Sequence, residues 1–153
     1  MSSGSSIEWT ETTWNPVTGC DRVSPGCDNC YALSLSARFK AMGQVKYQAD
    51  GDPRTSGPGF GVTMHWDVVD QPLGWRRPQT VFVNSMSDLA HPKVADEFVA
   101  AVFAVMGMAG RHRFQVLTKR PRRLRALLRK PAFREAIAGA MVERGGCGGR
   151  LRR

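Results

Sequence analysis

The chain is most constrained by an alternation of short apolar runs and amphipathic stretches over residues 80–142. The runs have the length and composition of buried parallel strands, and the longer stretches carry apolar residues at helical spacing. The expected strands are 80–84 and 114–117, and the expected helices are 92–109, 121–130 and 132–142. This order is typical of βα units around a parallel sheet or barrel. We therefore predict an α/β fold, an open partial (β/α) barrel of parallel strands, because a closed barrel needs about 250 residues.

The first half of the chain is richer in turns. Short strands are predicted at 7–10 and 62–66, and a helix is predicted after Cys30 that Gly43 ends. Residues 50–61 are expected to form a Gly/Pro loop.

Parallel α/β folds gather functional residues in the loops after the carboxyl ends of their strands. Two polar loops have this position, residues 84–88 and 118–120. The candidate cofactor-binding residues in these loops are Asn84, Ser87, Asp88 and Lys119. The alternative is that the polar residues of 84–88 only cap the next helix.

Three cysteines, Cys20, Cys27 and Cys30, have the spacing C-x6-C-x2-C. A C-x2-C pair on a turn directs two thiolates at one centre, and a third cysteine on a nearby loop completes a face. Gly19 and Gly26, each directly before a cysteine, let the backbone curl close to a cluster. We expect the three thiols to bind a metal centre, with their sulfur atoms converging on one point.

The identity of the metal stays open at this stage. Three thiolates leave one iron of a [4Fe–4S] cluster free for a small molecule. A zinc ion would instead take His65 or His91 as the fourth ligand of a closed site. Three unliganded core thiols are the remaining alternative. Cys147 lies in a Gly-rich stretch and is not expected to be a ligand.

The net charge of +9 is unevenly distributed. Residues 1–110 carry 8 Lys and Arg against 11 Asp and Glu, whereas residues 111–153 carry 14 against 2. Such a basic segment indicates an acidic partner such as nucleic acid, and the alternative is a solvated basic face. The candidate phosphate contacts are Arg120, Arg122, Arg123 and Arg125.

No membrane contact is expected, because the longest apolar run, residues 98–109, has the length of a buried helix. The first residues are small and polar, so no secretory signal is expected. We therefore expect a cytoplasmic protein, in which clustered cysteines bind metal more often than they form disulfides.

Long motifs occur along the chain in a defined order. They are IEWT at 7–10, TWNPVTGC at 13–20, SPGCDNCYA at 24–32, DQPLGWR at 70–76, VFVNSMSDL at 81–89 and FQVLTKRP at 114–121. Together they resemble a bacteriophage and prophage family with a three-cysteine motif, the phage gp-thirty-seven/gp-sixty-eight family, over roughly residues 7–135. A phage-encoded protein would act in the host cell cytoplasm.

That family has no established activity, but it is similar to radical S-adenosylmethionine enzymes. Those enzymes hold a [4Fe–4S] cluster by three thiolates after the first strand of a partial (β/α) barrel, and the methionine moiety of S-adenosylmethionine chelates the open iron. The resemblance implies a phage-encoded iron–sulfur protein similar to these radical enzymes. The basic C-terminal third adds the expectation that it acts on nucleic acid.

The chain departs from this pattern in two ways. The first cysteine gap is six residues instead of three, and Asn29 stands where an aromatic residue is usual. Family members also continue through further βα units, so the resemblance implies a truncated chain. We expect a partial barrel at 1–144, a disordered Gly/Arg tail at 145–153, and self-association or a protein partner over the exposed apolar surface.

Two further functions stay open. One is a zinc-stabilised nucleic-acid-binding module, and the other is a host-interaction protein without catalysis.

Overall fold

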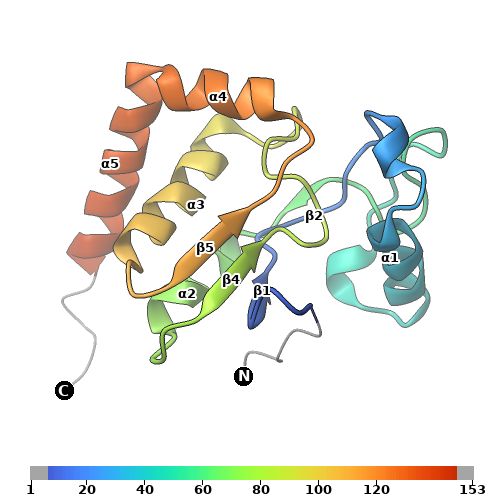
Figure 1. Cartoon of the computed structure of the whole chain (residues 1–153), viewed down its shortest axis with the longest axis horizontal. Coiled ribbons are helices and arrows are strands. Elements are labelled where there is room, and N and C mark those ends of the chain that lie inside the picture. Colours follow the sequence, from blue (N-terminus) through green and yellow to red (C-terminus); the bar gives the residue numbers. More distant parts are fainter. Residues whose placement is uncertain (1–6, 148–153) are drawn as a thin grey trace.

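A three-stranded parallel sheet lies at the centre of the protein. The computed structural model describes residues 7–147. The strands are β1 (Thr12–Trp14), β4 (Thr80–Val83) and β5 (Arg113–Val116), in the order β1-β4-β5 (Figure 1). Thr12 stands opposite Val81, which in turn stands opposite Phe114. β4 is the central strand, and its residues Val81, Phe82 and Val83 are buried, as the run at 80–84 predicts.

The helices of the second half follow β4 and β5. They are α3 (Asp96–Met108), α4 (Pro121–Arg129) and α5 (Pro131–Cys147). Helix α3 is the crossover that two neighbouring parallel strands require, and α5 packs against it (Figure 1). The βα order predicted from the sequence is therefore confirmed.

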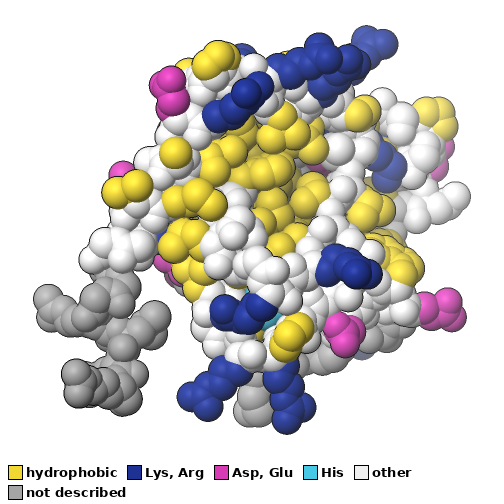
Figure 2. Space-filling model, turned by 60° about the vertical axis from the view of Figure 1, so that its left-hand side comes forward, with side chains coloured by type: hydrophobic (Ala, Val, Ile, Leu, Met, Phe, Trp, Pro, Cys, Tyr) yellow, Lys and Arg dark blue, Asp and Glu magenta, His cyan; other side chains and the backbone are white. Residues whose placement is uncertain are grey.

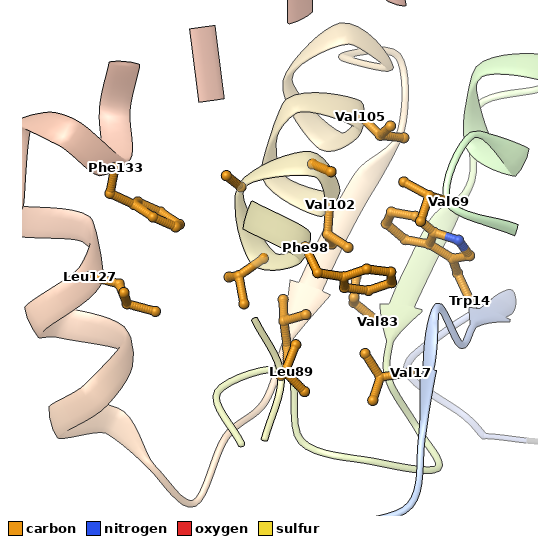
Figure 3. Packing of buried hydrophobic residues seen from close by; sticks show 14 of the residues in the cluster. Trp14, Val17, Val69, Val83, Leu89, Phe98, Val102, Val105, Leu127 and Phe133 are labelled. Carbon is orange, nitrogen blue, oxygen red and sulfur yellow. The ribbon is translucent and has the colours of Figure 1, made fainter. Parts of the chain in front are cut away.

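The main core lies between the sheet and α3 (Figure 3). Trp14 of β1, Val83 of β4 and Phe98 of α3 are completely or almost completely buried. Leu127 of α4 and Phe133 of α5 extend this core to the C-terminal helices. Full burial of side chains this large contributes roughly 1.5–3 kcal/mol each, so this core holds the βα units together.

The remaining elements lie between β1 and β4 along the chain. They are β2 (Val17–Thr18), η1 (Pro25–Cys27), α1 (Tyr31–Ala41), η2 (Val45–Tyr47), β3 (Thr63–Met64), η3 (Trp66–Val68) and α2 (Gln71–Gly74). Gly43 follows α1 with φ of 73°, so the predicted end of this helix is confirmed. A second, smaller core lies against α1 and is built on Tyr47, Phe60 and Met86. This core supports the side of the molecule that carries the cysteines.

Several predicted elements need correction. Residues 7–10 form a turn, and the strand begins at Thr12, because the Thr10 hydroxyl bonds to the carbonyls of Thr12 and Thr80. The expected strand at 62–66 shrinks to β3, which pairs antiparallel with β2 outside the main sheet. The helix expected from residue 92 begins at Asp96 because 88–94 form successive turns.

The C-terminal boundary also differs. Helix α5 runs through Cys147, beyond 142 and into the expected tail of 145–153. The rest of that tail, 148–153, lies outside the described residues. The fold comprises a three-strand parallel sheet and five helices, and no closed barrel forms within residues 7–147.

No helix within residues 7–147 combines the length and the apolar character that crossing a membrane requires.

Candidate metal centre at the cysteine loop

A pocket of about 380 Å³ lies where the strands of the main sheet end. Its lining includes the cysteine loop (residues 19–30), the loop after β4 and the loop after β5, together with the start of α1 and residues 55 and 60. The sequence-predicted residues that line it are Cys20, Cys27, Cys30, Asn84, Ser87, Asp88, Lys119 and Arg120. The structure thus brings the cysteines and both polar loops to one edge of the sheet, where parallel α/β folds place their sites.

Cys20 is positioned by its backbone. The N–H of Gly19 donates to the Met86 carbonyl at 3.1 Å, and the N–H of Cys20 donates to the Phe60 carbonyl at 3.3 Å. Gly19 has φ of 83°, and a Cβ there would meet the Gly61 carbonyl oxygen at 2.2 Å. Only glycine allows the chain to pass between these two backbones.

Cys27 and Cys30 are positioned by local turns. Cys27 ends η1, and its N–H donates to the Ser24 carbonyl at 2.9 Å. Cys30 is the N-cap of α1, and its N–H donates to the Cys27 carbonyl at 3.2 Å. This turn follows from Pro25 and Gly26 and brings both members of the C-x2-C pair to the pocket.

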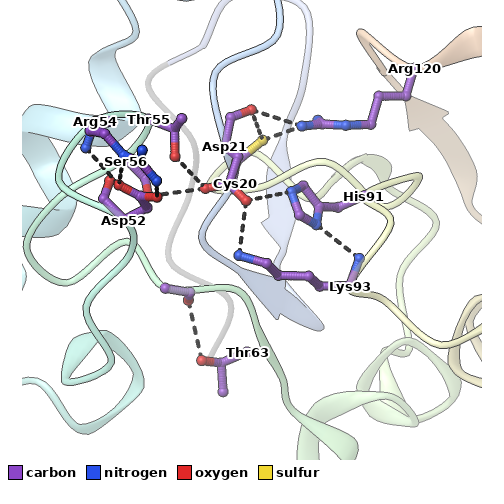
Figure 4. Close-up of polar contacts among 11 residues, drawn as sticks. Cys20, Asp21, Asp52, Arg54, Thr55, Ser56, Thr63, His91, Lys93 and Arg120 are labelled. Atoms are coloured by element: carbon purple, nitrogen blue, oxygen red, sulfur yellow. Dashed lines mark hydrogen bonds and ion pairs between the residues drawn. The ribbon is translucent and has the colours of Figure 1, made fainter.

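Asp21, directly after Cys20, anchors the loop to two distant segments (Figure 4). Its carboxylate accepts hydrogen bonds from Thr55 at 2.8 Å and Ser56 at 3.2 Å, and pairs with His91 and Lys93, each at 3.1 Å. Partial burial acts to raise the pKa of Asp21, but the hydrogen bonds from Thr55, Lys93 and Ser56 lower it to about 2. Asp21 is therefore ionised and fixes the cysteine loop between residues 55–56 and 91–93.

Arg120 reaches the same point from the loop after β5 (Figure 4). Its guanidinium donates to the Cys20 sulfur at 3.3 Å, to the Asp88 carboxylate at 3.1 Å and to the Asp21 carbonyl at 2.8 Å. The side chain is only 10% exposed. Arg120 is thus an internal part of the pocket wall.

Two of the thiols have different electrostatic environments. Burial raises the pKa of the Cys20 thiol, and the hydrogen bond from Arg120 opposes this only in part. Burial also acts to raise the pKa of Cys27, but hydrogen bonds at Val23 and Ser24, with the charge of Lys119, leave it lowered. Cys27 is therefore the more readily ionised of these two thiols.

The thiols of Cys20 and Cys27 have separate polar contacts in this structure. Across residues 7–147, no three His, Cys, Asp or Glu side chains are arranged to hold a single metal ion. Arg120 donates to the sulfur of Cys20, whereas the sulfur of Cys27 lies 4.0 Å from the Ser24 hydroxyl. Convergence of the three sulfur atoms on one metal centre stays a prediction.

Neither histidine proposed as a fourth zinc ligand lines the pocket. His65 Nε2 lies 2.8 Å from the Thr18 hydroxyl, and His91 Nε2 pairs with Asp21. Zinc holds its sulfur ligands about 2.3 Å away and so requires them tightly grouped, whereas a cluster separates its ligands over several irons. The three cysteines thus share one pocket that contains neither histidine.

The four candidate cofactor residues fall into two classes. Asp88 accepts hydrogen bonds from the Thr118 hydroxyl, from two backbone N–H groups and from Arg120, and it is 5% exposed. Ser87 donates to the Val17 carbonyl at 2.8 Å. These two side chains are therefore committed to joining the loops of the pocket.

Asn84 and Lys119 each keep a side-chain donor that pairs with no described residue. Asn84 has φ of 59°, and its side-chain oxygen accepts from the N–H of Val17, but its amide nitrogen has no partner among the described residues. Lys119 is exposed and forms no ion pair within residues 7–147. A strained, buried Asn with an unused donor is typical of a functional position.

The sequence of the chain matches a protein family. The model of DUF5131, described as a protein of unknown function, matches residues 4–145. The chain belongs to this family. It is the family also known as phage protein gp-thirty-seven/gp-sixty-eight, so the resemblance is confirmed at the level of the family. No curated protein matches the chain, and no solved structure does.

In this DUF5131 member the predicted phosphate-binding arginines separate into two groups. Arg120 faces the pocket, and Arg123 donates to the carbonyls of His91 and Val94 and pairs with Asp96. Arg122 and Arg125 are exposed on α4. Only the second pair is available for an external anion.

The sequence did not predict two features of this site, the role of Asp21 and the contact between Arg120 and Cys20. Asp21 had a usable signal, an acidic residue directly beside a cysteine. The contact between Arg120 and Cys20 had none, because these residues are 100 positions apart. Such a pair becomes visible only when βα topology brings the two loops together.

Proposed function

We propose that the protein holds a [4Fe–4S] cluster through Cys20, Cys27 and Cys30. The observation that carries the proposal is that three thiols of one loop line a single pocket at the carboxyl edge of a parallel sheet. A cluster supplies electrons, and three protein ligands leave one iron for a small molecule such as S-adenosylmethionine. On this proposal the sheet is part of a radical-enzyme-like partial barrel.

The other pocket residues have distinct roles on this proposal. Phe60 and Phe82 provide apolar wall that keeps water from the cluster. The unused amide of Asn84 and the ammonium of Lys119 offer donors to the carboxylate of a bound ligand. Ser87 and Asp88 keep the loops in place.

Anaerobic purification and reconstitution with iron and sulfide test the proposal. We expect a brown protein with broad absorption in the visible range and about four irons and four sulfides per chain. Added S-adenosylmethionine should change the electron paramagnetic resonance spectrum of the reduced sample. A colourless protein that takes up zinc but neither iron nor sulfide would contradict the proposal and favour the zinc-stabilised module.

A second candidate function is nucleic-acid binding, and one observation favours it. Residues 98–134 contain 10 Lys and Arg and no Asp or Glu. Arg122, Arg125 and Arg129 are exposed on α4 at spacings that place them on one face. Figure 2 shows dark blue Lys and Arg side chains gathered along the edge of the molecule where α4 lies. We call these three residues the arginine row.

The arginine row adjoins the cysteine pocket. A second hollow at the start of α4 shares Lys119 and Arg120 with that pocket and is also lined by Arg122. No carboxylate pairs with the arginine row within residues 7–147. A phosphate backbone along α4 would therefore lead to the pocket.

Removing the arginine row should weaken binding of nucleic acid and flatten its salt dependence. For R122Q/R125Q/R129Q we expect the slope of log K against log salt to fall by about three. Fluorescence anisotropy with a labelled single-stranded oligonucleotide and its duplex measures this. The matched control R76Q/R77Q/R113Q removes three exposed arginines before β4 and at the start of β5. Equal losses in the two variants would mean non-specific attraction to net charge.

Self-association or a protein partner stays a prediction. Hydrophobic side chains gather in the hollow between the C-terminal helices and the sheet (Figure 2). A host-interaction protein without catalysis would use such a surface while its cysteines bound no cluster.

A further inference from the structure

Arg120 stands at an unusual place for a surface arginine. It follows the loop after β5 directly before α4, within the basic segment from which an external phosphate contact was expected. Its side chain instead turns inward, is 10% exposed, and ends at the sulfur of Cys20. A buried guanidinium requires internal acceptors, so its neighbours explain what holds it there.

The carboxylate of Asp88 holds the guanidinium in place. Asp88 also accepts from the Thr118 hydroxyl at 2.7 Å and from the Lys119 N–H at 3.1 Å, and it is 5% exposed. Because the loop around β5 already binds this carboxylate, its position does not depend on Cys20. The pair of Asp88 and Arg120 therefore exists as a rigid donor aimed at the cysteine loop.

The second contact of Arg120 fixes the backbone beside the thiol. One terminal nitrogen donates to the Cys20 sulfur and to Asp88, and the other donates to the Asp21 carbonyl at 2.8 Å. Lysine has no planar fork and cannot reproduce these directions at once. The geometry therefore needs arginine in particular.

Hydrogen bonds to the sulfur ligands of a cluster tune its reduction potential. A donor and a positive charge beside a thiolate ligand stabilise the state with one electron more, because that state carries more negative charge. Among the described residues, Cys20 is the thiol that accepts a hydrogen bond from a guanidinium, whereas Cys27 has hydrogen bonds at Val23 and Ser24. One cluster ligand would thus have a charged donor in direct contact with its sulfur.

We propose that Arg120 is a positioning residue that donates a hydrogen bond to the Cys20 sulfur and raises the reduction potential of the cluster bound there. The inference rests on the proposed function, because it concerns a cluster on the cysteine loop. On this inference Arg120 belongs to the cluster site and does not contact nucleic acid.

The test is a redox titration of R120Q, R120K and R113Q beside the wild type, each reconstituted anaerobically and assayed for iron and sulfide. We expect R120Q to load the same amount of iron as the wild type and to show a more negative midpoint potential. R120K should also be more negative than the wild type, by less, because it keeps the charge and loses the fork. R113Q is the control, because Arg113 is exposed at the amino end of β5.

The outcomes distinguish failure of the proposed function from failure of the inference about Arg120. A wild type without iron and sulfide overturns the proposed function and this inference with it. A loaded wild type with an unchanged potential in R120Q overturns the inference alone. Failure of both R120Q and R120K to load iron, with a loaded wild type, would assign Arg120 to the integrity of the loop and also overturn the inference.

Discussion

Replacement of Cys30 by alanine is expected to abolish the uptake of iron and sulfide by the reconstituted protein. Three thiolates are the minimum that holds a cluster with one open iron, so the loss of one leaves two ligands and a labile site. Cys30 gives the clearest test of the three, because its side chain makes no capping hydrogen bond to α1. Alanine there removes a ligand without breaking a hydrogen bond of the fold. C20A and C27A should give the same loss.

Iron and sulfide content per chain, with the visible spectrum, measures this effect. C147A is the matched control, because it removes a thiol outside the cysteine loop and should load like the wild type. Unfolding midpoints of the apoproteins should agree closely between C30A and the wild type, which separates ligand loss from misfolding. Full iron content in C30A would show that the three cysteines are not the ligands.

Replacement of Gly19 by alanine should produce the second large effect, on stability and on the site together. The residue has φ of 83°, and a Cβ would lie 2.2 Å from the Gly61 oxygen and 2.4 Å from its carbonyl carbon. Both are backbone atoms, so relief requires displacing the cysteine loop from 60–61. We expect G19A to lower the free energy of unfolding by about 1–2 kcal/mol through the left-handed conformation, and by about 1–3 kcal/mol more through overpacking.

Gly43 provides the matched control. It has φ of 73°, but nothing lies within 4 Å of a Cβ built there. G43A should therefore lose only the conformational part, about 1–2 kcal/mol. Denaturant unfolding of the two apoproteins measures the difference, and iron uptake should fall in G19A alone. Equal free energies of unfolding for G19A and G43A would show that the close approach of residues 60–61 to Gly19 does not affect stability.

Periodicity determined much of this protein by itself. The apolar run at 80–84 becomes β4, the run at 114–117 overlaps β5, and the helical spacings give α3, α4 and α5. These elements have local signals, because burial on both faces of a central strand and along one face of a helix leaves a pattern in the sequence. The spacing of the cysteines likewise indicated one shared loop.

Short elements were beyond such reasoning. β1 has three residues, too few for a period, and its position follows from pairing with β4, 69 residues further along the chain. The extended segment at 62–66 could not reveal from its own composition that it pairs with β2. Long-range hydrogen bonds decide these cases.

Only the tertiary structure decided the character of the candidate site. The sequence placed Arg120 among phosphate contacts and treated Asp88 as a cofactor ligand, whereas folding buries both beside Cys20. It also could not set the directions of the thiols, because these depend on partners contributed by other loops. Local pattern determines which residues share an element, but the desolvation of charged groups forces them to find partners wherever the chain brings them together.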